Sequence, residues 1–244
     1  DAENFEAKAK DNLFQLAYYG FTPGKDEYSI ESLLTVGNGF MGLRGTTPEM
    51  EISDDTYPAT YLASLYDAAT SKVSGHDVVN EDFVNAPNAQ KMYLIIDGQK
   101  VAITKENVTY FKRQLNLKTG LFTAKAILSV GDKQIACTTE KIASMENVHE
   151  YYVRFSFTPL NFSGEVTFVS EIDGSVYNYN VARYRSLNRE HLDVVNTQAK
   201  ANNAVLVAKT KQSQITITQA AQLTSEEDLT NLVNETTEQK VFQK

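Results

Sequence analysis

The densest candidate for chemistry is the segment Glu31–Gly45, which reads ESLLTVGNGFMGLRG. Four of the chain's twelve glycines fall within its last nine residues, and Gly37–Gly42 fits the pattern G-x-G-x-x-G. In dinucleotide-binding proteins this pattern holds a pyrophosphate at the N-terminus of a helix. Here Gly45 and Pro48 follow so soon that no such helix has room to form. The segment is therefore predicted to be a glycine-rich strand–bulge–strand.

Two polar side chains of this segment need partners. Asn38 lies between two glycines, and Arg44 brings a charge into a mostly apolar run. We expect Asn38 to bond the local turn and Arg44 to pair with an internal acid such as Glu31. This interpretation gives the segment a structural role.

Metal and nucleophile chemistry finds little support in the sequence. His76, His149 and His191 are far apart and lack the spacing of a metal site, and there is no cysteine cluster. His149 is expected in a core or an interface, because it lies on the apolar face of a predicted strand. Cys137 is predicted to be a small buried strand residue and not a nucleophile. No metal ligand is predicted.

The acidic pairs Asp54–Asp55, Glu81–Asp82 and Glu226–Glu227 are each adjacent in the chain. Neighbours in a strand point to opposite faces, so we expect solvated charges. None offers two opposed carboxyl groups on separate elements, as glycoside hydrolysis requires. No catalytic residue is therefore predicted in this chain.

Tyrosines offer a second possible ligand surface, a platform on which sugar rings could stack. Tryptophan, the usual stacking residue, is absent, and tyrosine in sheets more often packs in the core or at an edge. Packing is the favoured interpretation. The candidates are Tyr61, Tyr66, Tyr93, Tyr152 and Tyr177.

Composition excludes several classes of partner. The net charge of −8 argues against nucleic acid, which needs clustered Lys and Arg. No apolar run approaches the length of a membrane-spanning helix, so no membrane partner is expected. The N-terminal residues show no signal peptide, although a leader could have been removed. The single cysteine fits a reducing compartment.

The elements that must position these residues are mostly strands. Alternating apolar residues predict strands over 121–130, 134–143, 149–158, 166–172, 204–209 and 214–219, and Asp97–Gly98 predicts a hairpin turn within 92–103. Residues 1–30 have no clear periodicity, and Tyr57–Asp67 fits a helix or a strand. One helix is predicted from an N-cap at Thr224 through Val233. The fold class is therefore all-β, a large antiparallel β-sandwich with few short helices.

Several spaced motifs resemble glycoside hydrolase family 65. Glu31–Gly45 closely resembles the family's N-terminal motif E-S-L-x-x-x-G-N-G-x-x-G-x-R-G. Three further segments resemble family motifs, with Ala59 in place of a usual glycine and Asn116 in place of a common aspartate: Tyr57–Ala63, Phe83–Asn88 and Leu115–Leu121. The most specific block is Ser144–Leu192. The resemblance favours a strand for Tyr57–Asp67.

The resemblance implies a fold and an activity for a longer parent protein. Family members are mostly inverting phosphorylases of α-linked glucose disaccharides such as maltose, trehalose and kojibiose, which yield β-glucose 1-phosphate. Their N-terminal domain is a supersandwich of the galactose-mutarotase type, followed by a catalytic (α/α)6 barrel and a C-terminal β domain. Residues 1–244 would be the N-terminal domain alone, inactive by itself. Inorganic phosphate would be the parent's co-substrate, with no metal or organic cofactor.

Partners and alternatives also follow from the resemblance. The expected partners are the chain's own barrel, a second copy in a homodimer, and a disaccharide at the parent's active site, in the cytoplasm. Asn38, Arg44, Glu31 and Tyr61 are candidates for bracing the barrel. The alternatives are a family 65 hydrolase of acid-trehalase type and a free-standing carbohydrate-binding module. A domain that docks on a barrel should expose an apolar patch or a sheet edge when alone.

Overall fold

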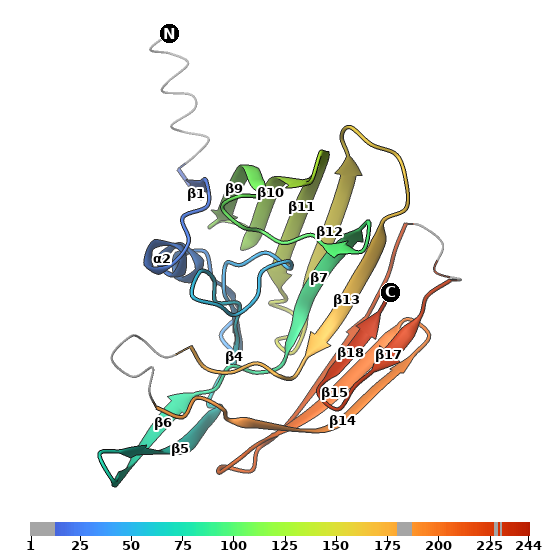
Figure 1. The fold of residues 1–244 in the computed structure, drawn as a ribbon. Coiled ribbons are helices and arrows are strands. Elements are labelled where there is room, and N and C mark those ends of the chain that lie inside the picture. The colour runs from blue at the N-terminus through green and yellow to red at the C-terminus, as the bar shows by residue number, and fades with distance from the viewer. Residues whose placement is uncertain (1–12, 180–186, 227–228, 230) are drawn as a thin grey trace. The chain divides into compact units, whose positions relative to one another are not determined.

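The computed structural model describes residues 13–179, 187–226, 229 and 231–244 (Figure 1). The chain divides into two compact units. Unit 1 comprises residues 1–47, 54–56 and 102–164, and unit 2 comprises residues 48–53, 57–101 and 165–244. Each unit is built from antiparallel strands, and the described residues contain one short α-helix. The predicted all-β class is therefore confirmed.

Unit 1 is centred on a five-stranded antiparallel sheet in the order β1-β9-β10-β11-β12. A helix and a short hairpin, β2–β3, complete the unit. Its elements are β1 (Gln15–Tyr19), α2 (Lys25–Leu33), β2 (Val36–Gly37), β3 (Met41–Leu43), β9 (Val108–Asn116), β10 (Leu121–Val130), β11 (Lys133–Ala143) and β12 (Tyr151–Pro159).

The alternation of buried and outward-facing residues along these strands explains which face of the sheet packs inward. On β10, Phe122, Ala124, Ala126 and Leu128 are buried, while the residues between them face outward. A strand with this period of two buries one face and leaves the other accessible. Cys137 on β11 is buried as predicted. The hydrophobic pattern therefore fixes which face of the sheet packs inward.

Unit 2 contains a five-stranded sheet, β17-β18-β13-β7-β8, a three-stranded sheet, β14-β15-β16, and the hairpin β5–β6. The strands are β4 (Thr60–Leu62), β5 (Tyr66–Val73), β6 (His76–Phe83), β7 (Asn88–Ile96), β8 (Gln99–Lys100), β13 (Thr167–Asp173), β14 (Leu192–Lys200), β15 (Asn203–Thr210), β16 (Thr216–Gln222), β17 (Asn234–Thr236) and β18 (Lys240–Gln243).

The core of unit 2 joins strands that are distant in sequence. One cluster contains Ile172, Leu206 and Val241, from β13, β15 and β18. A second contains Leu65, Val84 and Ile217. Because these residues come from separate hairpins, their burial requires the whole unit to assemble.

Several sequence-based predictions of elements are confirmed. Asp97 and Gly98 both have positive φ, at 51° and 75°, and they connect the paired strands β7 and β8. A turn with positive φ at both central residues matches the twist of a hairpin. The strands predicted over 204–209 and 214–219 are β15 and β16. The ambiguous segment Tyr57–Asp67 contains β4 and the start of β5, and it forms no helix.

The prediction of helices from the sequence was wrong twice: one predicted helix is not formed by the described residues, and the helix α2 was not predicted. Of the helix predicted from Thr224 to Val233, residues 227, 228 and 230 lie outside the described residues, and the described ones are not helical. A segment this short has little intrinsic helical stability without a packed face. The helix α2 was missed because its buried residues are Glu27 and Glu31, and not an apolar stripe. No helix among the described residues is long and apolar enough to cross a membrane.

Candidate functional site

The glycine-rich segment begins inside the helix α2 and ends in the hairpin β2–β3. Its predicted strand pair is confirmed in Val36–Gly37 and Met41–Leu43, but Glu31–Leu33 are helical. The two strands meet through a turn that contains Gly39 at φ 89°. No helix follows these glycines, so a pyrophosphate cradle does not form.

Helix α2 carries two carboxylates into the interior of unit 1. Glu27 and Glu31 are four residues apart, which places them on one face of the helix. Both are fully buried. A buried carboxylate is costly unless a cation or several donors face it. The strands of the unit supply these partners.

Arg113 on β9 is the partner of Glu27. Its Nη1 lies 2.5 Å from Oε1 of Glu27, and its Nη2 donates to Oε2 at 2.8 Å. Arg113 also donates to the carbonyl oxygen of Gly45 at 3.2 Å. Burial raises the pKa of Glu27, while the Arg113 guanidinium opposes the rise. The two-point contact fixes the helix against the sheet.

Arg44 is the partner of Glu31, as the sequence predicted. Its Nη2 donates to Oε2 of Glu31 at 3.1 Å and to the carbonyl oxygen of Tyr28 at 2.9 Å. Its Nη1 donates to Oγ of Ser32 at 2.8 Å. Arg44 therefore fastens the end of the hairpin to three residues of the helix.

Lys141 on β11 lies beneath the same segment, where it is fully buried. Its Nζ donates to the carbonyl oxygens of Arg44 at 2.6 Å and Thr46 at 3.1 Å. Burial lowers the pKa of Lys141 to about 7, with nearby Glu31 opposing the shift and Arg113 adding to it. The ammonium group is thus held by backbone oxygens, and sequence patterns had not identified it.

Gly45 has a close-packing role. The backbone of Leu34 passes so near that a Cβ on Gly45 would lie 2.3 Å from Cβ of Leu34. The Gly45 amide donates to the carbonyl oxygen of Glu31 at 2.8 Å. Only glycine permits this approach, so the final glycine of the motif serves the contact between hairpin and helix.

Asn38 organises the turn and joins it to a second loop. Its Oδ1 accepts from the amides of Phe40 at 3.1 Å and Met41 at 2.9 Å, which confirms the predicted local bonds. Its Nδ2 donates to the carbonyl oxygens of Ser144 at 2.7 Å and Val148 at 3.0 Å. The turn is therefore tied to the connection between β11 and β12.

His149 does not lie in the core, and its predicted place in an interface stays a prediction. His149 is exposed in that connection and precedes β12, and its ring meets Phe40 edge-on at 4.4 Å between centroids. The strand starts two residues later than the alternation suggested, since β12 begins at Tyr151. His149 is therefore part of the surface beside the Asn38 turn.

The five tyrosines do not gather into one platform. Tyr61 and Tyr66 both stack on Phe83, with ring centroids 4.9 and 5.1 Å apart. Tyr93 is buried, and Tyr152 belongs to unit 1. Tyr61 also contacts the hydroxyl group of Tyr57 at 3.3 Å. Tyr61, Phe83 and Tyr66 therefore form a compact stack of three rings in unit 2.

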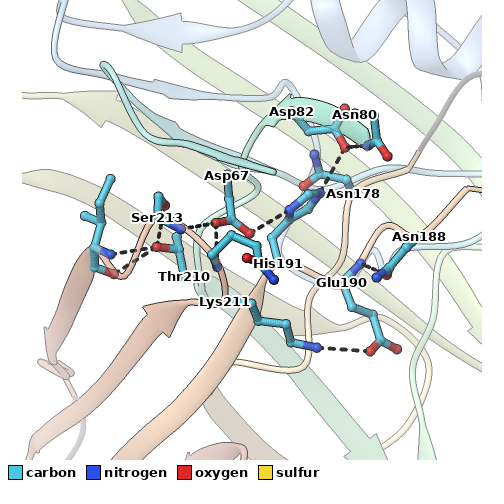
Figure 2. Close-up of polar contacts among 12 residues, drawn as sticks. Asp67, Asn80, Asp82, Asn178, Asn188, Glu190, His191, Thr210, Lys211 and Ser213 are labelled. Carbon is cyan, nitrogen blue, oxygen red and sulfur yellow. Dashed lines mark hydrogen bonds and ion pairs between the residues drawn. The ribbon is translucent and has the colours of Figure 1, made fainter. Parts of the chain in front are cut away.

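Figure 2 shows a buried histidine of unit 2 between two carboxylates. Nδ1 of His191 lies 3.1 Å from Oδ2 of Asp67, and Nε2 lies 3.0 Å from Oδ2 of Asp82. Oδ1 of Asp67 accepts from the amides of Gln212 at 2.9 Å and Ser213 at 2.7 Å. This cluster links the hairpin β5–β6 to the loop between β15 and β16.

Asp82 was predicted to be a solvated charge, but its side chain is 23% exposed and lies against His191, whereas no prediction covered Asp67. Burial alone would raise the pKa of Asp67, but the Ser213 amide, the His191 ring and the Gln212 amide together hold it below the ordinary value. Asp82 bonds both His191 and Asn80. One weak sequence signal pointed to this cluster: the polar residue His191 directly precedes the alternating residues at the start of β14.

A further buried cation, Lys91 on β7, is surrounded by three carboxylates. Its Nζ lies 3.0 Å from Glu171, 3.1 Å from Asp173 and 3.2 Å from Glu51. These carboxylates raise the pKa of Lys91 although burial opposes the shift. Lys240 on β18 shares Glu171 and Asp173. The cluster connects β7, β13 and β18.

These contacts define what the arrangement can do. The described residues contain no group of three or more His, Cys, Asp or Glu side chains placed to hold a metal ion. The buried charges around the glycine-rich segment bond to one another or to the backbone. The Glu31–Gly45 segment therefore takes part in a network of buried, paired charges that supports the fold.

Comparison with known proteins identifies the family of this chain. The model of the glycosyl hydrolase family 65 N-terminal domain matches residues 16–244. The fold and this match define the class, a β-rich N-terminal domain of glycosyl hydrolases. The chain belongs to the N-terminal domain of glycosyl hydrolase family 65.

Three relatives illustrate the extent of the match. The chain is 34% identical over 225 residues to an uncharacterised glycosyl hydrolase of Mycobacterium tuberculosis, covering 90% of this chain and 17% of that protein. It is 34% identical over 199 residues to trehalose 6-phosphate phosphorylase of Lactococcus lactis, covering 79% and 24%. It is 27% identical over 205 residues to kojibiose phosphorylase of Caldanaerobacter subterraneus, covering 83% and 24%. The chain thus spans about a quarter or less of these relatives.

A solved structure shares the fold. It comes from the human microbiome and is provisionally named a kojibiose phosphorylase. The TM-score is 0.76 at 18% identity, and the match covers 94% of this chain and 29% of that one. At this level of identity the likeness concerns the fold.

Proposed function

We propose that this chain is the non-catalytic N-terminal domain of an inverting α-glucoside phosphorylase. The observation that carries the proposal is the internal use of the buried charges, since Glu27, Glu31 and Lys141 bond within unit 1. Relatives named as phosphorylases of trehalose 6-phosphate and kojibiose support the class of reaction. The domain would pack its sheets as the supersandwich expected for the family.

The parent enzyme would act on an α-linked glucose disaccharide in the cytoplasm. Inorganic phosphate would attack the anomeric carbon while a glutamic acid of the barrel protonates the leaving glycosidic oxygen. Phosphate takes the place of the activated water in an inverting hydrolase, so one carboxylic acid suffices. The products would be β-glucose 1-phosphate and the released sugar. The parent is further proposed to be a homodimer.

The domain's role would be to support the barrel through the surface around Asn38. Phe40, Met145, Val148 and His149 lie on the turn and the loop that Asn38 joins. Met145 is 77% exposed and Val148 is 36% exposed. Exposed apolar residues held by fixed hydrogen bonds suit a docking surface. Arg44, Glu31 and Asn38 would hold its shape from within.

Activity measurements test the non-catalytic role. The 244-residue chain is incubated with phosphate and each of maltose, trehalose, trehalose 6-phosphate and kojibiose, and glucose 1-phosphate is measured. We expect none. Release of glucose 1-phosphate by the chain alone would show that it carries its own active site.

Substitutions in the full-length parent test the docking surface. Met145→Ser should lower the thermal stability and activity of the parent, because its apolar contact with the barrel is lost. Leu117→Ser is the matched control, since Leu117 is also exposed but lies at the β9–β10 turn. Equal behaviour of the two variants would contradict docking through the Asn38 surface.

A carbohydrate-binding role is the second candidate. The stack of Tyr61, Phe83 and Tyr66 favours it, because aromatic rings at a surface can pack against sugar rings. Calorimetry of the chain with α-glucans at millimolar concentration tests this role. A hydrolytic parent is a third candidate, favoured by the relative named as a glycosyl hydrolase. Phosphate dependence of the full-length enzyme separates it from a phosphorylase.

A further inference from the structure

The outer face of the hairpin β9–β10 contains a shallow hollow of about 150 Å³. The residues that line it alternate along the two strands, so they share one face of the sheet. They are Tyr110, Lys112, Gln114, Thr123 and Lys125. This face lies opposite the side that packs into the core of unit 1.

Two lysines face each other across this hollow. Lys112 and Lys125 are register partners in the antiparallel pair β9–β10. Side chains directly opposite in such a pair are about 5 Å apart at Cβ, and like charges there are destabilising. Neither lysine forms an ion pair with any residue in the described part of the chain. An anion between the two ammonium groups would remove this repulsion.

Among the described residues, no nearby carboxylate takes that place. Glu140 lies on the same face as the register partner of Thr123, but it pairs with Arg154 at 3.3 Å. The ring of Tyr19 lies 5.3 Å from Nζ of Lys112. Such a contact attracts the ammonium group but does not neutralise its charge. The hollow is therefore electropositive although the chain as a whole is acidic.

The remaining lining groups suit a polyhydroxylated ring. Gln114 and Thr123 are register partners and offer an amide and a hydroxyl group. Tyr110 is 42% exposed and presents an aromatic ring beside them. The volume lies below the roughly 300 Å³ at which pockets for drug-sized ligands begin. The hollow is therefore too small for a drug-sized ligand, and one monosaccharide with a single small substituent is the largest ligand that it would hold.

We propose that this hollow binds a sugar phosphate. The phosphate dianion lies between Lys112 and Lys125, and it neutralises their repulsion. The sugar hydroxyl groups bond Gln114 and Thr123, and the ring packs against Tyr110. The site is independent of the parent's reaction, because no step of that reaction uses these residues.

Binding to the 244-residue chain tests the proposal. Glucose 6-phosphate, glucose and inorganic phosphate are titrated separately and followed by NMR shifts of the backbone amides of 108–130. We expect saturable binding of glucose 6-phosphate that is tighter than binding of either component. Lys112→Gln and Lys125→Gln should each weaken it by about tenfold or more, because each removes a charge-assisted hydrogen bond. Lys118→Gln, in the turn of the same hairpin, should bind as the unchanged chain does.

Thermal unfolding gives an independent readout. Without ligand, Lys112→Gln and Lys125→Gln should unfold at the same temperature as the unchanged chain or higher, because each removes repulsion. Glucose 6-phosphate should raise the midpoint of the unchanged chain and of Lys118→Gln only. The proposal is overturned by absent binding, by inorganic phosphate binding as tightly as glucose 6-phosphate, or by unchanged affinity in both lysine variants. Two separate variants keep the test decisive if one fails to fold.

Discussion

Arg113 and Glu27 form a two-point ion pair in unit 1, and both side chains are completely shielded from solvent. Arg113 comes from the middle of β9, and Glu27 comes from the first turn of α2. The pair therefore joins the one described helix to the central sheet at a point where apolar packing would be expected. Its geometry explains why the helix buries acidic residues.

Removing Arg113 should destabilise unit 1 strongly. Arg113→Met leaves the Glu27 carboxylate buried without its cation, a change that costs about 3–5 kcal/mol. Urea unfolding followed by tyrosine fluorescence measures the effect, since the chain has no tryptophan. The double variant with Glu27→Leu should recover part of the loss, because the unpaired charge is then gone.

A matched control for this pair is Arg154→Met. Arg154 pairs with Glu140 on the sheet surface at 3.3 Å, and its side chain is 74% exposed. Exposed pairs contribute about 0–1 kcal/mol. Similar losses of unfolding free energy in Arg113→Met and Arg154→Met would show that the buried pair stabilises the chain no more than the exposed pair does.

The glycines of the Glu31–Gly45 segment should differ in their tolerance of a side chain. In Gly45→Ala the new Cβ would overlap Leu34, so we expect a loss above about 3 kcal/mol or failure to fold. In Gly42→Ala the nearest atom is 3.8 Å away, on Thr35, so the loss should stay below about 1 kcal/mol. Thermal unfolding of the two variants compares them. A tolerated Gly45→Ala would contradict the close approach of hairpin and helix.

Lys141 should give the chain a stability that rises with pH. Its pKa falls from an ordinary 10.5 to about 7 in the folded protein, so between these values the unfolded chain binds more protons. Stability should therefore be lowest at and below pH 7 and increase toward pH 10, by at most about 1.4 kcal/mol per pH unit. Urea midpoints at pH 6, 7, 8 and 9 measure the slope.

The variant Lys141→Met isolates this contribution. Its unfolding free energy should lack the rise between pH 7 and 9, whatever its absolute stability. Tyr93, whose pKa is raised to about 12, affects only pH values above its ordinary 10. An unchanged slope in Lys141→Met would assign the pH dependence to other groups.

Asp67 should contribute a stability that also rises with pH, but in the acid range. Its pKa is held below the ordinary 3.8, so its contribution is present above that value and is lost as the pH falls through the folded value. Asp67→Asn should cost about 1–3 kcal/mol at pH 7, because hydrogen bonds to a charged acceptor are weakened. Its unfolding free energy should also fall less between pH 4 and pH 2.

The control for Asp67 is Asp193→Asn on β14. Asp193 is exposed and lies 4.0 Å from Lys211, so its replacement should change stability by less than about 0.5 kcal/mol. Unfolding by urea at pH 7, 4 and 2 compares the two variants. A flat acid response in the unchanged chain would contradict the role of the Asp67 carboxylate.

The sequence by itself determined the strands with clear alternation (β10 to β13, β15 and β16), the hairpin turn at Asp97–Gly98 and the family, but it did not predict β5, β6, β9 or β14. Strand alternation and turn chemistry are local, so neighbouring residues suffice to reveal them. The pairing of Arg44 with Glu31 was also within reach, because the two residues lie 13 positions apart on one motif.

Only the tertiary structure decided which polar residues are buried together. Glu27 and Arg113 are 86 residues apart in the chain, and Asp67 and His191 are 124 apart. An ion pair has no sequence period, and a buried glutamate looks like a solvated one until its partner strand is in place. For the same reason α2 was missed, since its inward face is charged and its burial depends on Arg113 from the sheet and on Arg44 after the hairpin β2–β3.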